Sequence, residues 1–87
     1  MNLLFVMLEA VVDVAHEWMK LGAGFAAVVA AFGAAFGISK IAKAALESIA
    51  RQPEAGADLR SSMIVSAALI EGVTFFAIVV CLLILFV

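Results

Sequence analysis

The chain has 87 residues, of which 68% are hydrophobic, and its mean hydropathy is +1.30. A soluble domain is usually about 45–50% apolar, and a fold this small could not bury such a surface, so lipid must cover much of it. The formal net charge of −2 and the lack of a basic cluster exclude nucleic acid as a partner.

Residues 1–17 are predicted to form an N-terminal amphipathic extension. A signal peptide would begin with a basic region, whereas this start is acidic. Its ionisable residues recur every three or four positions and therefore lie on one helical stripe. Two arrangements stay open: a helix lying on the membrane surface, or a forward extension of the next helix. The ionisable residues of this segment are Glu9, Asp13, His16 and Glu17, and Lys20 just beyond it continues the stripe.

Residues 18–50 are predicted to form the first transmembrane helix, because their uncharged core at 21–38 is just long enough to span a membrane. Small residues crowd its surface and let other helices approach closely. Glycine is a poor residue for a soluble helix, so we expect tight packing against several neighbouring helices. The residues predicted to make these contacts are Ala31, Gly33, Ala35, Gly37 and Ser39.

Residues 51–57 are predicted to form a polar loop. Pro53 disfavours a helical Gln52, and Gly56 permits a tight reversal of the chain. With so short a connector, the two helices must return antiparallel as a hairpin. Four of the five Lys and Arg residues lie in or near this loop. The positive-inside rule therefore places the loop in the cytoplasm and both termini outside.

Residues 58–87 are predicted to form the second transmembrane helix. Between positions 61 and 87 the only charged residue is Glu71. A charge at the centre of a span costs roughly 2.5–3.5 kcal/mol on insertion scales, so an ionisable residue there is a functional site by default. Glu71 follows Arg60 by a helical rise of roughly 16 Å in a hydrocarbon core about 30 Å thick. Its carboxyl is therefore expected near the midplane.

The surroundings of Glu71 indicate a proton carrier. Folding the hairpin at position 54 or 55 brings Glu71 level with position 37 or 38, so we expect its carboxyl to face Ala34, Gly37 and Ile38. No Lys or Arg lies at that depth, so desolvation should keep the carboxyl neutral until it meets water or a positive charge on another protein. Sodium would need more oxygen ligands, which the side chains of Ile38 and Gly72 lack.

The chain resembles the proteolipid of the F-type ATP synthase, the c-type protein of its rotor ring. The resemblance covers roughly residues 20–87 and rests on three motifs: GISKI at 37–41, ARQPEA at 50–55 and AALIEG at 67–72. It implies a closed ring of many copies, with the first helices inside and the second helices outside. Glu71 resembles the ion-carrying carboxylate of the family. The residues that would support it are Ala34, Ile38, Leu69 and Gly72.

The same resemblance implies partners. Glu71 would take a proton from one half-channel of the a subunit of the membrane sector, travel round the ring facing lipid, and release it into the other half-channel. A conserved arginine of the a subunit would favour the ionised carboxylate. Ile38 and Gly72 stand where sodium-type relatives have glutamine and serine or threonine, which favours protons. The residues that match the loop contacting the gamma and epsilon subunits of the central stalk are Arg51, Gln52 and Pro53.

Together these features predict an all-α membrane protein, a two-helix transmembrane hairpin that assembles into a closed homo-oligomeric ring. We expect a non-catalytic ATP synthase component that transports H⁺ and has no cofactor; the lone Cys81 offers no metal site. Without a transit peptide, we expect it among the lipids of a bacterial inner (plasma) membrane. Two alternatives stay open: a sodium-driven ring of the same family, or a structural hairpin without transport.

Overall fold

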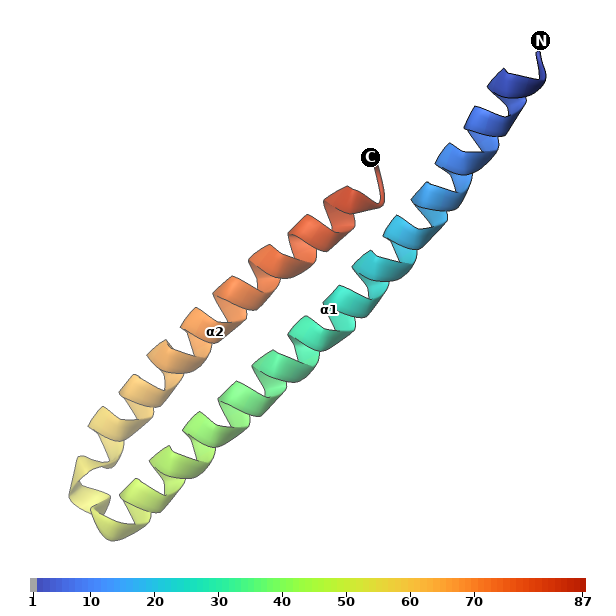
Figure 1. The fold of residues 1–87 in the computed structure, drawn as a ribbon. Helices are drawn as coiled ribbons and strands as arrows, with labels where there is room; N and C mark the ends of the chain where they lie inside the picture. The colour runs from blue at the N-terminus through green and yellow to red at the C-terminus, as the bar shows by residue number, and fades with distance from the viewer. Residues whose placement is uncertain (1) are drawn as a thin grey trace.

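The computed structural model describes residues 2–87, which form one helical hairpin (Figure 1). Helix α1 comprises Leu3–Arg51, the short 3-10 helix η1 comprises Pro53–Ala55, and helix α2 comprises Gly56–Ile84. The two long helices run antiparallel, and the rod they form measures 77 × 15 × 8 Å along its principal axes. The predicted all-α hairpin is confirmed.

Helix α1 is one continuous helix of 49 residues. Asn2 caps its start, because the Asn2 side-chain oxygen accepts a hydrogen bond from the Phe5 backbone N–H at 2.8 Å. The chain has a single proline, at position 53, so nothing in α1 forces a break. Two arrangements were left open for residues 1–17, a helix lying on the membrane surface or a forward extension of the next helix. The described part of this segment is a forward extension, because it forms one continuous helix with the residues that follow.

The connector is shorter than the predicted loop at 51–57. Arg51 still belongs to α1, and the Gln52 N–H donates to the Ser48 carbonyl at 2.8 Å, which closes the last turn. Pro53 then opens η1, where its fixed φ and missing N–H cost nothing. The prediction that Gly56 makes the reversal is wrong: its φ of −56° is helical, and it begins α2. The reversal lies at Gln52, with φ −134° and ψ 73°.

The two helices meet through small side chains. Within the described residues, only Ala23 and Ala34 are buried apolar residues, at 4% and 8% exposure, and both face α2. On α2, half-buried residues recur every three or four positions against α1. These residues are Met63, Ser66, Ala67, Ile70, Thr74, Ala77, Cys81 and Ile84.

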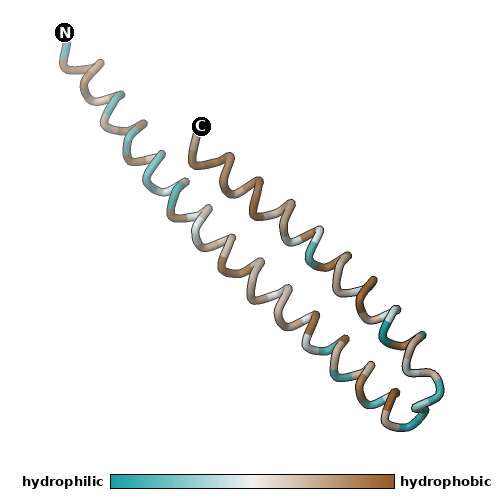
Figure 2. Tube along the Cα trace, turned by 180° about the vertical axis from the view of Figure 1, so that it is seen from behind, coloured by the Kyte–Doolittle hydropathy of each residue, from teal (hydrophilic) through white to brown (hydrophobic). Residues whose placement is uncertain are grey.

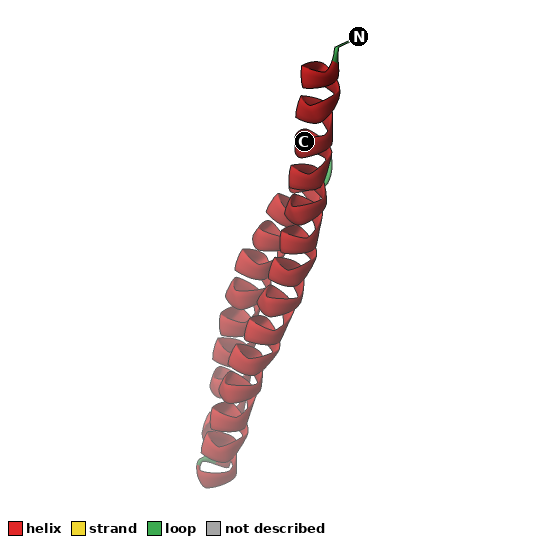
Figure 3. Cartoon of the chain, turned by 45° about the vertical axis from the view of Figure 1, so that its right-hand side comes forward, coloured by secondary structure: helices red, strands yellow, loops and turns green. Residues whose placement is uncertain are grey.

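Most of the apolar surface lies outside this interface. Both helices are long and apolar enough to cross a membrane, and only 11% and 6% of their most apolar windows are buried in the hairpin. Figure 2 shows hydrophobic residues along most of both helices, with hydrophilic ones gathered at the connector and in the N-terminal part of α1. Seen from the side, α2 stays beside α1 while α1 continues beyond the C-terminus (Figure 3).

Candidate ion-binding site

Glu71 lies in the apolar part of α2, away from both of its ends. It stands roughly 16 Å from Arg60 and roughly 20 Å from Ile84, the last residue of α2, along the helix axis. The register of the hairpin is fixed by Gly37, where an added Cβ would lie 3.3 Å from the Ile70 Cδ1 atom. This contact pairs position 37 with position 70, next to the predicted pairing of 37 or 38 with 71. The predicted height of Glu71 therefore agrees with the contact.

The prediction that Glu71 faces the glycine-rich stretch of its own chain is wrong. Ile70 occupies the place opposite Gly37 and is half-buried, whereas Glu71 is exposed. Successive residues of an α-helix are rotated by about 100°, so Glu71 points to one flank of the hairpin when Ile70 points to α1. The carboxyl is therefore available to a neighbouring molecule rather than held between the two helices.

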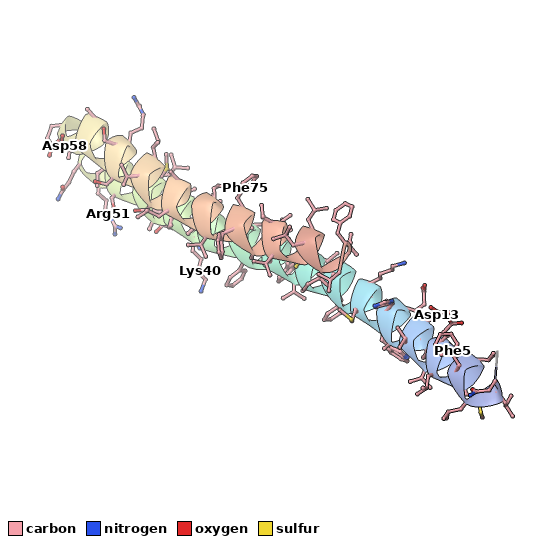
Figure 4. All side chains as sticks on the ribbon, turned by 90° about the horizontal axis from the view of Figure 1, so that it is seen from above. Phe5, Asp13, Lys40, Arg51, Asp58 and Phe75 are labelled. Atoms are coloured by element: carbon pink, nitrogen blue, oxygen red, sulfur yellow. The ribbon has the colours of Figure 1, made fainter. Side chains whose placement is uncertain are left out.

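Within residues 2–87, no hydrogen bond or ion pair engages the Glu71 side chain. The Thr74 hydroxyl, one turn away, donates to the Ile70 carbonyl at 2.8 Å. The ion pair formed by the described residues joins Lys20 to Glu17 at 3.7 Å, far from this site. Lys40 lies with its Nζ atom 4.7 Å from the centre of the Phe36 ring (Figure 4). A counter-charge for Glu71 must therefore come from outside the hairpin.

The opposite flank of the hairpin carries a groove of about 510 Å³ at the same height. Leu69 lines it and precedes Glu71 by two residues, which is a rotation of about 200° and places the two side chains on opposite flanks. The groove is almost entirely apolar, and small residues of α1 form its floor. Its lining residues are Ala30, Gly33, Ala34, Gly37, Leu69, Ile70, Val73, Thr74 and Ala77.

The four residues predicted to support Glu71 do not enclose it within one chain. Ala34 is buried and Leu69 is 68% exposed, and both line the groove on the other flank. Ile38 is half-buried on α1. Gly72 is exposed, and an added Cβ there would meet no atom within 4 Å. A complete site would need a second chain beside the first.

The predicted packing residues divide into two groups. Gly37 packs within the hairpin against Ile70, as described above. The other four, Ala31, Gly33, Ala35 and Ser39, are exposed and so remain free to meet another molecule. The predicted stalk-contact residues Arg51, Gln52 and Pro53 are likewise exposed, at the connector end of the rod.

Sequence reasoning missed two features of the site, the Ile70–Gly37 contact and the groove. A signal for the first was present: positions 63, 66, 70, 74 and 77 follow the three-and-four spacing of a helix seam, and position 71 is outside it. The groove has no comparable signal, because its lining combines residues from two helices.

Comparison with known proteins gives one family. The model of the ATP synthase C-subunit family matches residues 21–84. The chain is 58% identical over 67 residues to the ATP synthase c-subunit of Phocaeicola vulgatus, covering 77% of this chain and 80% of the relative. The ATP synthase c-subunit of Bacteroides thetaiotaomicron is also 58% identical over 67 residues, covering 77% of this chain and 79% of the relative. The ATP synthase c-subunit of Latilactobacillus sakei is 50% identical over 66 residues, covering 76% of this chain and 94% of the relative.

Proposed function

The chain belongs to the ATP synthase C-subunit family, and on this basis we propose that Glu71 is the group by which it carries protons across the membrane. Membership makes the chain an integral membrane protein and the rotor component of an ATP synthase. Membership leaves open the ion, the residue that carries it, the ring and the partner proteins.

One observation carries the proposal: the carboxyl and the groove lie at the same height on opposite flanks of the hairpin. Copies placed side by side in the same orientation would set Glu71 of one against the groove of the next. This head-to-tail contact uses two different surfaces and closes into a ring when the rotation between copies closes. Each junction would then hold one carboxyl, with α1 helices inside and α2 helices outside.

The chemistry of each junction follows from the absence of a counter-charge on the described part of the hairpin. Desolvation disfavours the carboxylate, so Glu71 faces lipid as the neutral acid. Where the ring meets the a subunit of the membrane sector, a positive side chain of that partner favours the carboxylate, and the proton leaves into one half-channel. A proton from the other half-channel restores the neutral acid, and the copy moves back into lipid. Each proton contributes about 2.3 kcal/mol per 100 mV.

The ion is proposed to be H⁺ because the described hairpin offers Glu71 no side-chain oxygen to complete a sodium shell. Sodium, a hard cation, takes several oxygen ligands. In the groove lining that would meet a neighbour's Glu71, Thr74 alone carries a side-chain oxygen, and one hydroxyl is too few to complete a sodium shell. Ile38 and Gly72 carry no polar side-chain atom. A neutral carboxylic acid needs no such shell.

The exposed connector is proposed to contact the gamma and epsilon subunits of the central stalk from the cytoplasm. Arg51, Gln52 and Pro53 lie at one end of the rod, together with most of the basic residues of the chain. The positive-inside rule then places both termini on the outer side of a bacterial plasma membrane. The ring takes no catalytic step itself and delivers its rotation to the stalk.

Replacing Glu71 by glutamine tests the carrier role. Glutamine is close in shape to the neutral acid but cannot release a proton, so Glu71→Gln should leave the ring assembled and abolish ATP synthesis driven by a proton gradient. The matched control is Glu9→Gln, an exposed carboxyl remote from the site, which should leave synthesis unchanged. Synthesis by the Glu71→Gln complex would refute the carrier role. Loss of the ring itself would assign Glu71 to packing, as in a structural hairpin.

A further inference from the structure

Helix α1 projects beyond the end of α2. The last residues of α2 and its C-terminal tail, 84–87, share a surface hollow with His16, Met19 and Lys20. The described residues before this level, 3–15, continue α1 by a helical rise of roughly 18 Å, and we call them the projection. Figures 1 and 3 show this part of α1 extending alone past the C-terminus. The match to the family model begins at residue 21, so it does not reach the projection.

The ionisable residues of the projection lie on the side of α1 that faces α2 elsewhere. His16 marks this side, because it lines the hollow together with the C-terminal tail. Asp13 and Glu9 precede it at spacings of three and four residues and lie within about 60° of its direction. Figure 4 shows Asp13 in this region. In a ring with α1 inside, this side would face outward, so these charges would meet water rather than a neighbouring copy.

The two flanks of the projection are apolar. Leu8 precedes His16 by eight residues, a net rotation of about 80°, and Ala15 lies on the same flank at about 100°. Val6 and Ala10 lie on the other flank, because each is two residues from Leu8 and therefore rotated from it by about 200°. All four are exposed in the hairpin, Leu8 at 56% and Val6 at 45%. Apolar surface of this kind, continued along both flanks of a helix, marks a contact with another molecule.

We propose that a second copy of this chain covers each flank, so that the projections of neighbouring copies pack side by side as a collar beyond the end of α2. The inference rests on the proposed ring and adds to it a contact made by residues outside the family match. One flank of each projection would meet the opposite flank of the next projection, as the groove meets Glu71 at the depth of the span.

The flanks that meet in the collar continue the sides that meet in the ring. Ala15 precedes Gly33, which lines the groove, by 18 residues. This is five complete turns, so the flank with Leu8 and Ala15 lies on the groove side of α1. The other flank therefore lies on the Glu71 side. Because α1 is one continuous helix, copies that join these sides in the span bring the two flanks together in the projection.

The two flanks also fit each other in height and size. Copies in the same orientation hold equal positions at equal heights, so Leu8 of one copy lies midway in height between Val6 and Ala10 of the next. Side chains of one helix pack into the gaps between side chains of its neighbour, and a gap of this kind lies between residues spaced by four. The small Ala10 and Ala15 let the helix axes approach to the usual distance of about 8–10 Å. This fit favours a second copy over water as the occupant.

The charges near the projection are compatible with this contact. Glu17 lies on the same flank as Ala10, and its carboxylate is 3.7 Å from the Lys20 Nζ atom of its own chain. That pairing offsets the charge nearest to the neighbouring copy. Glu9 and Asp13 recur in every copy but lie on the outward side, where water and salt screen their repulsion.

Disulfide formation between paired cysteines tests the contact. In a Cys81→Ala background, Leu8→Cys/Ala10→Cys places one thiol on each flank, about 3 Å apart in height. The two thiols of one chain point in nearly opposite directions and cannot bond to each other. A bond requires Cα atoms within about 7 Å, so each bond would join two adjacent copies, and successive bonds would give a ladder of oligomers. Rings purified under reducing conditions are oxidised with copper phenanthroline and analysed on denaturing, non-reducing gels.

The matched control is Glu9→Cys/Val11→Cys in the same background. It keeps the two-residue spacing, but rotation by about 100° turns one thiol outward and the other inward, away from the flanks. Leu8→Cys alone is a second control, because its flank meets the opposite flank of the neighbour and not the same one. Val6→Cys/Leu8→Cys repeats the measurement across the proposed contact.

We expect a ladder from the two flank pairs and single chains from both controls. Single chains from every variant would show that the projections lie apart, in water or on the membrane surface, and would overturn the inference. Equal ladders from the flank pairs and the Glu9→Cys/Val11→Cys control would show random collision of unpacked projections and would overturn it too. Native gels report ring assembly independently: missing rings in the Cys81→Ala background would sink the proposed function, whereas intact rings without a ladder would sink only the collar.

Discussion

Filling the groove on the Leu69 flank should prevent ring assembly and leave the hairpin intact. Gly33 lines this groove, and a Cβ added to it meets no atom within 4 Å in its own chain. A leucine at position 33 would therefore fit the isolated hairpin. It would occupy the space that we assign to the neighbouring copy and its Glu71.

The size of the effect follows from the number of junctions. Overpacking a fitted interface costs about 1–3 kcal/mol, and each 1.4 kcal/mol is roughly a tenfold change in an association constant. A closed ring has one such junction for every copy, so the penalty applies at each of them. Gly33→Leu should therefore abolish assembly rather than weaken it.

Native gels and circular dichroism together measure the two parts of this prediction. Gly33→Leu should migrate as a monomer in detergent that preserves the wild-type ring, with unchanged helicity. Gly72→Leu is the control, because Gly72 also has open space around its Cβ position but points away from α1. That variant should still form rings. Normal rings from Gly33→Leu would show that no neighbour occupies the groove, and the reasoning from complementary flanks would fail.

Four further results are expected. Thr74→Val, which removes the hydroxyl bonded to the Ile70 carbonyl, should leave proton-driven synthesis within twofold of wild type; a large loss would make the hydroxyl an ion ligand. Carbodiimide labelling of Glu71 should decrease as pH rises and should not change when sodium is added. Protection of Glu71 by sodium would instead identify sodium as the transported ion. Arg51→Ala should keep the ring but weaken its binding to the isolated stalk, as measured by co-purification; undiminished binding would remove Arg51 from the contact. Asn2→Ala should speed amide exchange at Phe5 by the loss of a cap bond, about 0.5–2 kcal/mol, without changing ring assembly.

Much of the fold was predictable because a membrane span has strict requirements. Length and apolarity located two helices, the one proline located the turn, and the lone charge between positions 61 and 87 located the site. The height of Glu71 was predictable too, since 1.5 Å per residue and a short connector fix which positions lie level. The connector length was overestimated, because the residues from Gly56 onward are compatible with either loop or helix and the structure makes them helix.

The direction in which Glu71 points was decided only by the tertiary structure. The sequence by itself determined the residue, its depth and its lack of a counter-charge on the chain. Its direction depends on which side of α2 packs on α1, and that choice belongs to Ile70, whose side chain fits against Gly37. Because each residue is rotated by about 100° from the last, packing by Ile70 turns Glu71 out to the flank, where a second chain can complete its site.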